Sequence, residues 1–361
     1  MNNGPAVFCM NLYRSILNKR KISSKIELTF ITEDIIGNEE NVIKVSNKLS
    51  NRCRNLGMLI KSFEYFKVTR NNNYDFLVWN FSVLSWYSII RYNKKTKNVV
   101  FVNDPYSLNI GSVLNYKTLR LKLFRIFESY SCRKSYHVIT NSVIIKNEIV
   151  KQYEIDSQKV SVLHKGIDCN TENKLKLNWE IDITSPIRIA FVKSDYISGG
   201  LELLYQSCLL ITHLNFEIVV IGPESNNVKP FFDKSNVEIK LMGKLKDKSK
   251  LYNEIINCDI FCVPNMKEAF GQANCEAMLL QIPTIILPID YQMALHDSSY
   301  CWIPEFVNKV SLSKSVLEII EETLAKRKLK SERARNTILK KYNFENTREE
   351  FYSILNKIAH E

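Results

Sequence analysis

The sequence predicts an α/β protein made of two Rossmann-like domains in tandem. Short apolar runs rich in β-branched and aromatic residues alternate with longer amphipathic runs, which is typical of parallel strands joined by helices. The chain has 361 residues, too many for one comfortable core and suited to two domains of about 150 to 200 residues. Since the alternation runs through both halves, each half is expected to form its own sheet.

The predicted strands are the short apolar runs. In the first half they are residues 26–31, 76–80, 98–102, 136–140 and 160–163, and in the second half residues 187–191, 216–221, 237–242, 260–263 and 284–287. Helical patterns lie between most of them, for example over residues 201–210, 248–256 and 272–280. The polar stretch 170–182 keeps neither period, and we expect the domains to join there.

The start of the chain departs from this plan. A doubly wound domain normally opens with a strand that feeds a glycine turn, whereas residues 8–17 already carry a helical pattern. A central parallel strand is buried on both faces, so its loss would leave a gap in the sheet. We therefore expect the first strand to be missing or to lie upstream of residue 1.

Cysteine usage and hydropathy exclude several classes of protein. The nine cysteines form no CxxC pair, and Cys258 and Cys262 flank an apolar run that is predicted to be a buried strand, which favours core residues over metal ligands. Unpaired thiols without a secretory signal favour the cytoplasm. The most apolar stretch, residues 76–90, is interrupted by Asn80 and falls short of the about 20 apolar residues of a transmembrane helix.

The positive charge is concentrated in the first half. Residues 1–175 contain 27 Lys and Arg against 14 Asp and Glu, whereas the remainder contains 23 against 24. Such a half could face nucleic acid, an anionic membrane surface or a polyanionic substrate. No RNA-binding, helix-turn-helix or zinc-finger spacing is present, so we expect no nucleic-acid partner.

The candidate chemistry lies after the strand 260–263. This strand leads into a short loop that holds Glu268, and a helix begins near Gly271. In open α/β sheets ligands bind beyond the carboxyl ends of the strands, where this loop falls. The backbone amides of residues 270–273, at a helix N-terminus, are suited to a phosphate or diphosphate.

Glu276 lies on that same helix, one turn after Gln272. Its neighbours are mostly apolar, and a carboxylate on a buried helix is costly unless it has hydrogen-bond donors, which sugar or ribose hydroxyls would supply. Taken singly, Glu268 also fits a surface loop residue, and Glu276 also fits a salt-bridged helix residue.

In combination these segments resemble the retaining glycosyltransferases of family 4. Residues 268–278, followed by 282–285, resemble the Glu-x7-Glu signature of that family. Further resemblances follow in order along the chain, to the N-terminal glycine loop and first helix, the end of the first domain, and the closing helix: residues 2–13, 136–142 with 159–168, and 343–352. The similarity spans nearly the whole chain.

The resemblance implies the GT-B fold, two Rossmann-like domains with a cleft between them. Residues 1–175, completed by the C-terminal helix 345–361, would form the acceptor-side domain, and residues 176–344 would bind the nucleotide sugar. The implied reaction transfers a sugar from a nucleoside diphosphate sugar, needs no metal or other cofactor and retains the anomeric configuration. Its main physical task is to stabilise the departing diphosphate and the positive charge that grows at the anomeric carbon.

The resemblance also implies roles for individual residues. Glu268 would act on the donor sugar as the catalytic carboxylate, and Glu276 would bind the nucleotide ribose. The amides near Phe270, Gly271 and Gln272 would hold the sugar or diphosphate. In the first domain, Gly4 would let the backbone approach the donor.

The chain departs from the family pattern at several positions. Ser194 stands where the family has an Arg and Gly199 where it has a Lys, and these two cations usually clamp the diphosphate. Lys193 is the nearby cation in the sequence that could replace one of them. Asn103 stands before Asp104, at a first-domain position where the family often has a histidine. Asn103 and Asp104 are the candidate residues on the acceptor side.

The segment 116–130 suggests a membrane contact. Its apolar face is predicted to carry Tyr116, Leu119, Leu123, Phe127 and Tyr130, with Lys117, Arg120, Lys122 and Arg125 interleaved. This pattern fits a core-facing helix with a solvated basic side, and it also fits a helix that rests on anionic lipid.

Three functions follow from these observations. The first is a retaining glycosyltransferase that works on a glycan or lipid-linked acceptor at the cytoplasmic face of a membrane, in bacterial surface polysaccharide synthesis. The second, suggested by Ser194 and Gly199, is a catalytically inactive GT-B protein that binds a glycan or a partner enzyme. The third is a sugar-nucleotide epimerase of the same architecture.

Overall fold

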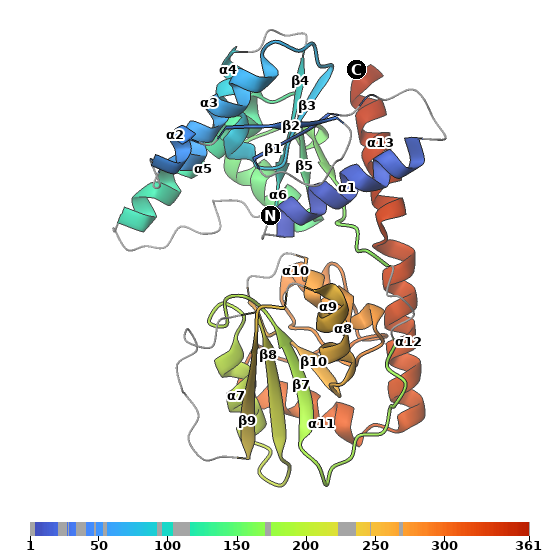
Figure 1. Cartoon of the computed structure of the whole chain (residues 1–361). Coiled ribbons are helices and arrows are strands. Elements are labelled where there is room, and N and C mark those ends of the chain that lie inside the picture. Colours follow the sequence, from blue (N-terminus) through green and yellow to red (C-terminus); the bar gives the residue numbers. More distant parts are fainter. Residues whose placement is uncertain are drawn as a thin grey trace. The chain divides into compact units, whose positions relative to one another are not determined.

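The protein divides into two compact units. Unit 1 comprises Met1–Gly166 and Phe344–Glu361, and unit 2 comprises Ile167–Asn343 (Figure 1). The computed structural model describes residues 4–20, 27, 29–33, 41–46, 48–52, 56–91, 96–103, 116–169, 175–222, 236–245, 247–266 and 270–360.

Unit 1 contains a four-stranded parallel sheet in the order β3-β4-β5-β6. A separate parallel pair, β1 with β2, precedes it. In chain order the elements are α1 (Gly4–Arg20), β1 (Phe30–Thr32), β2 (Val42–Lys44), α2 (Lys48–Arg52), α3 (Gly57–Thr69), β3 (Phe76–Trp79), the 3-10 helix η1 (Ser82–Ser85), α4 (Trp86–Arg91), β4 (Lys97–Val102), α5 (Tyr116–Lys134), β5 (His137–Thr140), α6 (Val143–Tyr153), the 3-10 helix η3 (Ser157–Lys159), β6 (Val160–Val162) and α13 (Phe344–His360).

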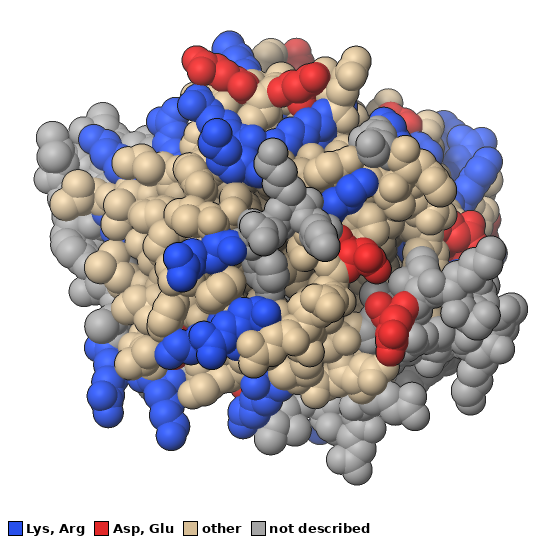
Figure 2. All heavy atoms as spheres, turned by 90° about the horizontal axis from the view of Figure 1, so that it is seen from above, with Lys and Arg blue, Asp and Glu red and all other residues tan. Residues whose placement is uncertain are grey.

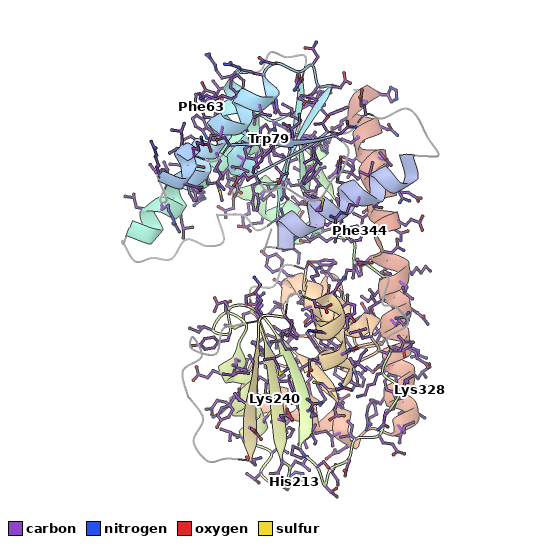
Figure 3. The ribbon with its side chains drawn as sticks, in the orientation of Figure 1. Phe63, Trp79, His213, Lys240, Lys328 and Phe344 are labelled. Carbon is purple, nitrogen blue, oxygen red and sulfur yellow. The ribbon has the colours of Figure 1, made fainter. Side chains whose placement is uncertain are left out.

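The last helix completes the core of unit 1. Strands β4 and β5 are buried almost throughout, as expected for central parallel strands covered on both faces. Helix α1 contributes Phe8 to the same core as Phe351 of α13. The ring of Phe8 also stacks on that of Phe344, with 6.2 Å between centroids. Phe344 is the first residue of α13 (Figure 3). The helix 345–361 predicted to complete this domain therefore contacts it directly.

Unit 2 contains a five-stranded parallel sheet in the order β11-β10-β7-β8-β9. Its elements in chain order are β7 (Ile187–Val192), α7 (Leu201–Leu209), β8 (Phe216–Ile221), β9 (Val237–Gly243), α8 (Lys248–Ile256), β10 (Ile260–Cys262), α9 (Gln272–Leu279), β11 (Thr284–Ile285), α10 (Asp290–Met293), α11 (Lys309–Glu321) and α12 (Leu324–Lys341). Figure 1 shows β7 and β8 in the middle of this sheet, with β9 at one edge.

The parallel strands place the candidate site residues at one end of the sheet in unit 2, where the strands have their carboxyl ends. All five strands are parallel, so the loops that follow β7, β10 and β11 leave from the same edge of the sheet. Strand β9 is exposed on one face, where Lys240 pairs with Glu217 of β8 at 3.6 Å (Figure 3). Further into the sheet, the strands β7 and β10 are almost wholly apolar and buried.

The sequence-based prediction of α/β architecture is confirmed, and each predicted strand overlaps a strand of the structure. The predicted strand 26–31 overlaps β1 only at its end, and residues 26 and 28 lie outside the described part of the chain. The helix predicted over residues 8–17 is part of α1. The short strand β2 was not predicted, because three half-exposed residues provide too little apolar periodicity. Cys258 and Cys262 are free and buried in the core of unit 2, as predicted for core residues.

The prediction for the face of α5 is wrong in part. Leu123 and Phe127 pack with Phe124 against Leu59 and Val83, so this side of the helix faces the core. Leu119 is instead 61% exposed, and Ile126, which was not assigned to that face, is 64% exposed. The apolar residues of α5 are thus divided between a buried side and an exposed side.

None of the described helices is both long and apolar enough to span a bilayer.

A buried arginine holds the end of α11 in unit 2. The guanidinium of Arg327 donates to the carbonyl oxygens of Ile319 at 2.9 Å, Ile320 at 3.1 Å and Glu322 at 2.7 Å, and to that of Trp179 at 2.6 Å. The first three carbonyls belong to the C-terminal end of α11, where helix carbonyls lack intrahelical partners. Arg327 therefore ties this helix end to the segment that precedes β7.

We predict that Arg327→Met lowers the free energy of unfolding by about 3 kcal/mol, because carbonyl oxygens that now accept from a buried cation would lose their partner. Urea unfolding measures this difference. Arg333→Met is the matched control, since Arg333 is exposed on the same helix. Equal unfolding midpoints for the two variants would contradict the role of Arg327.

Candidate active site at the carboxyl edge of the second sheet

Glycine residues allow the loops of unit 2 to approach one another at the carboxyl ends of its strands. A Cβ added to Gly200, which has φ 79°, would lie 2.3 Å from the carbonyl oxygen of Pro264. A Cβ added to Gly222, which has φ 128°, would lie 2.6 Å from the carbonyl oxygen of Lys193. Because both glycines have a positive φ and no Cβ, they allow the loops after β7, β8 and β10 to pack closely against one another.

Gly271 starts α9 in the left-handed conformation, with φ 73° and no side-chain cap. A Cβ at this position would lie 2.7 Å from Nδ2 of Asn274, so only glycine fits. That amide group donates to Oε1 of Gln292 at 3.2 Å, and Gln292 comes from α10. The first turn of α9 is thus positioned by buried amides, and its N-cap residue is a glycine, which has no side chain to cap the helix.

Phe270 has a different environment from the neighbouring polar residues. Its ring is 3% exposed and packs edge-to-face against Tyr342, with 5.5 Å between centroids. His296 lies in the same cluster and donates or accepts at Tyr300, with 3.3 Å between Nδ1 and the hydroxyl. Burial lowers the pKa of His296 to about 4, so the ring is neutral at physiological pH. The side chain of Phe270 therefore anchors the loop, which leaves its backbone for any ligand contact.

Glu276 is a buried carboxylate on an apolar helix. It is 8% exposed, and its helix neighbours Cys275, Ala277 and Met278 belong to the core. Burial raises the pKa of Glu276, whereas Lys248 and the Gln272 side chain lower it. The distances to Oε1 are 3.8 Å from Nζ of Lys248 and 3.4 Å from Nε2 of Gln272. The predicted pair of Gln272 and Glu276 therefore shares one face of α9.

Lys248 was not among the predicted site residues. It is the first residue of α8 and follows Asp247, whose side chain caps that helix. Its ammonium also lies 3.4 Å from Oδ2 of Asp168. Sequence reasoning missed Lys248 and Asp168 because they are 80 residues apart and share no motif with Glu276. Only the fold shows that Lys248 of α8 lies beside the buried carboxylate of Glu276 on α9.

Lys193 lies directly after β7, where its N–H donates to the carbonyl of Ile221 at 3.0 Å. A Cβ built on Gly199 would lie 3.0 Å from Cγ of Lys193 and 2.6 Å from the ring of Phe191. The stem of Lys193 therefore runs beside Gly199, at the edge of the sheet from which the candidate residues leave. Ser194 follows Lys193 and is exposed.

The candidates in unit 1 are placed by its own sheet. Asn103 follows β4, is 6% exposed, and its Nδ2 donates to the carbonyl of Asn80 at 3.1 Å. Its own carbonyl accepts from Nδ2 of Asn141 at 3.1 Å. Asn103 therefore links the carboxyl ends of neighbouring strands in unit 1, and Gly4 is the first residue of α1. Asp104 and Glu268 lie outside the described residues.

A metal centre is not built by the described residues of the chain, among which no three or more His, Cys, Asp or Glu side chains gather in a manner that would hold an ion.

Two family models together cover most of the chain. The model described as Glycosyltransferase Family 4 matches residues 17–171, and the model described as Glycosyl transferases group 1 matches residues 176–337. The first match falls largely in unit 1, and the second falls within unit 2.

Individual relatives are distant in sequence. Protein CapJ of Staphylococcus aureus is 24% identical over 321 residues, which is 85% of this chain and 80% of CapJ. Among solved structures, a sucrose-phosphate synthase from Thermosynechococcus elongatus matches with a TM-score of 0.71 at 12% identity and covers 97% of this chain and 94% of its own. HepE of Anabaena, solved with UDP and glucose, matches with a TM-score of 0.65 at 12% identity over 99% of this chain and 97% of HepE.

Each family model matches a part of the chain that contains one of the two parallel sheets. The glycine loops and Glu276 lie within the part that the second model matches. The protein belongs to the GT-B glycosyltransferases that pair a family-4 domain with a group 1 domain.

Proposed function

We propose that the protein transfers a sugar from a nucleoside diphosphate sugar to a glycan or a lipid-linked acceptor, with retention of the anomeric configuration. The observation that carries this proposal is the buried carboxylate of Glu276, which faces Gln272 and Lys248 at the edge where the strands of unit 2 end. Ribose hydroxyls would supply the hydrogen-bond donors that a buried carboxylate requires. The complex of the related HepE with UDP and glucose supports a donor of this class.

The diphosphate would lie against the first turn of α9. The backbone N–H groups there and the positive end of the helix dipole favour an anion. Lys193 would add a cation, because its stem runs beside Gly199, where the family pattern has a lysine. These groups would stabilise the leaving diphosphate without a bound metal or other cofactor. Glu268, from the same loop, would act on the donor sugar.

The alternative proposal is a catalytically inactive protein that binds a glycan or a partner enzyme. The replacement of two clamp cations by Ser194 and Gly199 favours it, because each charge-assisted hydrogen bond contributes about 1.5 to 3 kcal/mol. A protein of this kind would bind a nucleotide sugar without turning it over. Donor turnover therefore distinguishes it from the transferase.

The acceptor would be presented at a membrane, in the synthesis of a surface polysaccharide at the cytoplasmic face. Leu119, Lys122 and Ile126 follow one another at spacings of three and four on the exposed side of α5. Arg133 and Lys134 are exposed at the end of the same helix. Exposed apolar residues among basic residues are complementary to an anionic bilayer surface. Figure 2 shows one face of the protein on which Lys and Arg side chains are widely spread and Asp and Glu side chains are few.

We predict that Glu276→Ala weakens nucleotide binding by about 10-fold or more, because the ribose hydroxyls would lose a charged acceptor. Isothermal titration calorimetry with UDP- and GDP-sugars measures the effect. Glu318→Ala is the matched control, since Glu318 is an exposed glutamate on α11 of the same unit. Equal affinity of wild type and Glu276→Ala would remove Glu276 from the site.

We also predict that the protein binds vesicles that contain anionic phosphatidylglycerol and not vesicles of phosphatidylcholine alone. The double variant Leu119→Ser/Ile126→Ser should bind about 10-fold more weakly, because it removes most of the apolar area that enters the bilayer. Vesicle co-sedimentation measures this, with Leu177→Ser, an 88% exposed leucine of unit 2, as the control. Unchanged binding of the double variant, or equal binding to neutral vesicles, would contradict the proposed contact.

A further inference from the structure

Two carboxylates of unit 2 meet around one ammonium group, that of Lys248. Nζ of Lys248 lies 3.8 Å from Oε1 of Glu276 and 3.4 Å from Oδ2 of Asp168. It also lies 5.2 Å from the centre of the Tyr252 ring, one turn further along α8. The side chains of Lys248 and Asp168 are 41% and 46% exposed, whereas that of Glu276 is 10% exposed. The ammonium therefore stands between a buried carboxylate and solvent.

This ion pair leaves hydrogen-bonding capacity on Glu276. A separation of 3.8 Å exceeds the usual length of an N–H···O bond, and the contact with Gln272 at 3.4 Å is also long. A carboxylate offers about four lone-pair sites, and within the described part of the chain these two side chains are the partners found for that of Glu276. Lys248 thus compensates the charge of Glu276 without using up its acceptor sites.

The hydroxyl of Tyr252 is a second polar group beside this cluster. It is buried and has no hydrogen-bond partner among the described residues. Burial raises the pKa of Tyr252, and the charges of Glu276 and Asp168 raise it further. A buried hydroxyl without a partner is costly in the unliganded protein. The cluster therefore offers both an acceptor and a donor to a ligand that carries adjacent hydroxyl groups.

We infer that Lys248 is a positioning residue that holds the carboxylate of Glu276 ionised and oriented toward the two ribose hydroxyls of the donor nucleotide. The inference rests on the proposed function, because Glu276 must contact ribose. Lys248 acts through Glu276, and the contact with Asp168 fixes the ammonium on its exposed side. Its effect is specific to hydroxyl groups of the ribose and does not extend to the diphosphate or the sugar.

A purely structural ion pair makes a different prediction. If Lys248 only stabilised α8 against α9, its loss would weaken the binding of every nucleotide equally. If Lys248 positions Glu276, its loss would weaken the binding of a ribonucleotide more than that of the matching 2′-deoxyribonucleotide, because the deoxy compound has only one of the two hydroxyls that donate to Glu276.

The test compares UDP with 2′-deoxyUDP by calorimetry, together with the GDP and ADP pairs, since the nucleobase is unassigned. We expect wild type to bind the ribonucleotide about 10-fold more tightly than its deoxy counterpart. Lys248→Met should reduce this preference to less than about 3-fold, with a smaller loss of affinity for the deoxynucleotide than for the ribonucleotide, and Lys248→Arg should restore it. Lys250→Met, a change at an exposed lysine of α8, should match wild type.

Thermal unfolding verifies that each variant is folded, and Lys248→Gln replaces the methionine variant if that one is not. An unchanged preference in the neutral variant, or an equal loss for both members of a nucleotide pair, would overturn the role of Lys248 and leave the proposed function intact. If wild type binds none of the six nucleotides, the proposed function fails together with the inference.

Discussion

The buried carboxylate of Glu276 is the constraint on which the site of unit 2 depends. Removal of a carboxylate from water costs several kcal/mol unless nearby groups compensate it. The structure supplies a cation from α8 and an amide from α9 itself, at 3.8 and 3.4 Å. It also requires glycine at 271, because α9 starts where a side chain would meet Asn274. The start of α9 at Gly271, the carboxylate of Glu276 and the groups that compensate its charge therefore depend on one another.

The sheet architecture could be predicted from sequence because its strands are central. A strand covered on both faces consists of consecutive apolar residues, so β4, β5, β7, β8 and β10 are visible as short runs without further knowledge. The edge of the site could also be predicted, since loops after parallel strands gather at one edge. Gly271, Gln272 and Glu276 are close in sequence, and helix geometry alone places the last two on one face.

The rest depends on contacts between distant segments. Lys248 reaches Glu276 from another helix, and Gln292 supports the first turn of α9 from a third, so neither carries a local signal. The two faces of α5 were misassigned for the same reason: its apolar residues surround the helix, and only the positions of α3 and η1 decide which of them are buried. The packing of Lys193 beside Gly199 likewise requires knowledge of how the loop after β7 turns.

The central claim is that the chain turns over a nucleoside diphosphate sugar although Ser194 and Gly199 replace the usual cations. The most direct measurement is mass spectrometry of products from a panel of nucleotide sugars, incubated with and without a membrane extract as acceptor source. We expect nucleoside diphosphate release and a glycosylated product that need the acceptor and are lost in Glu268→Ala, with Lys193→Met about 10-fold or more slower. Binding of a nucleotide sugar without turnover would contradict catalysis, and an altered sugar formed without acceptor would indicate an epimerase instead.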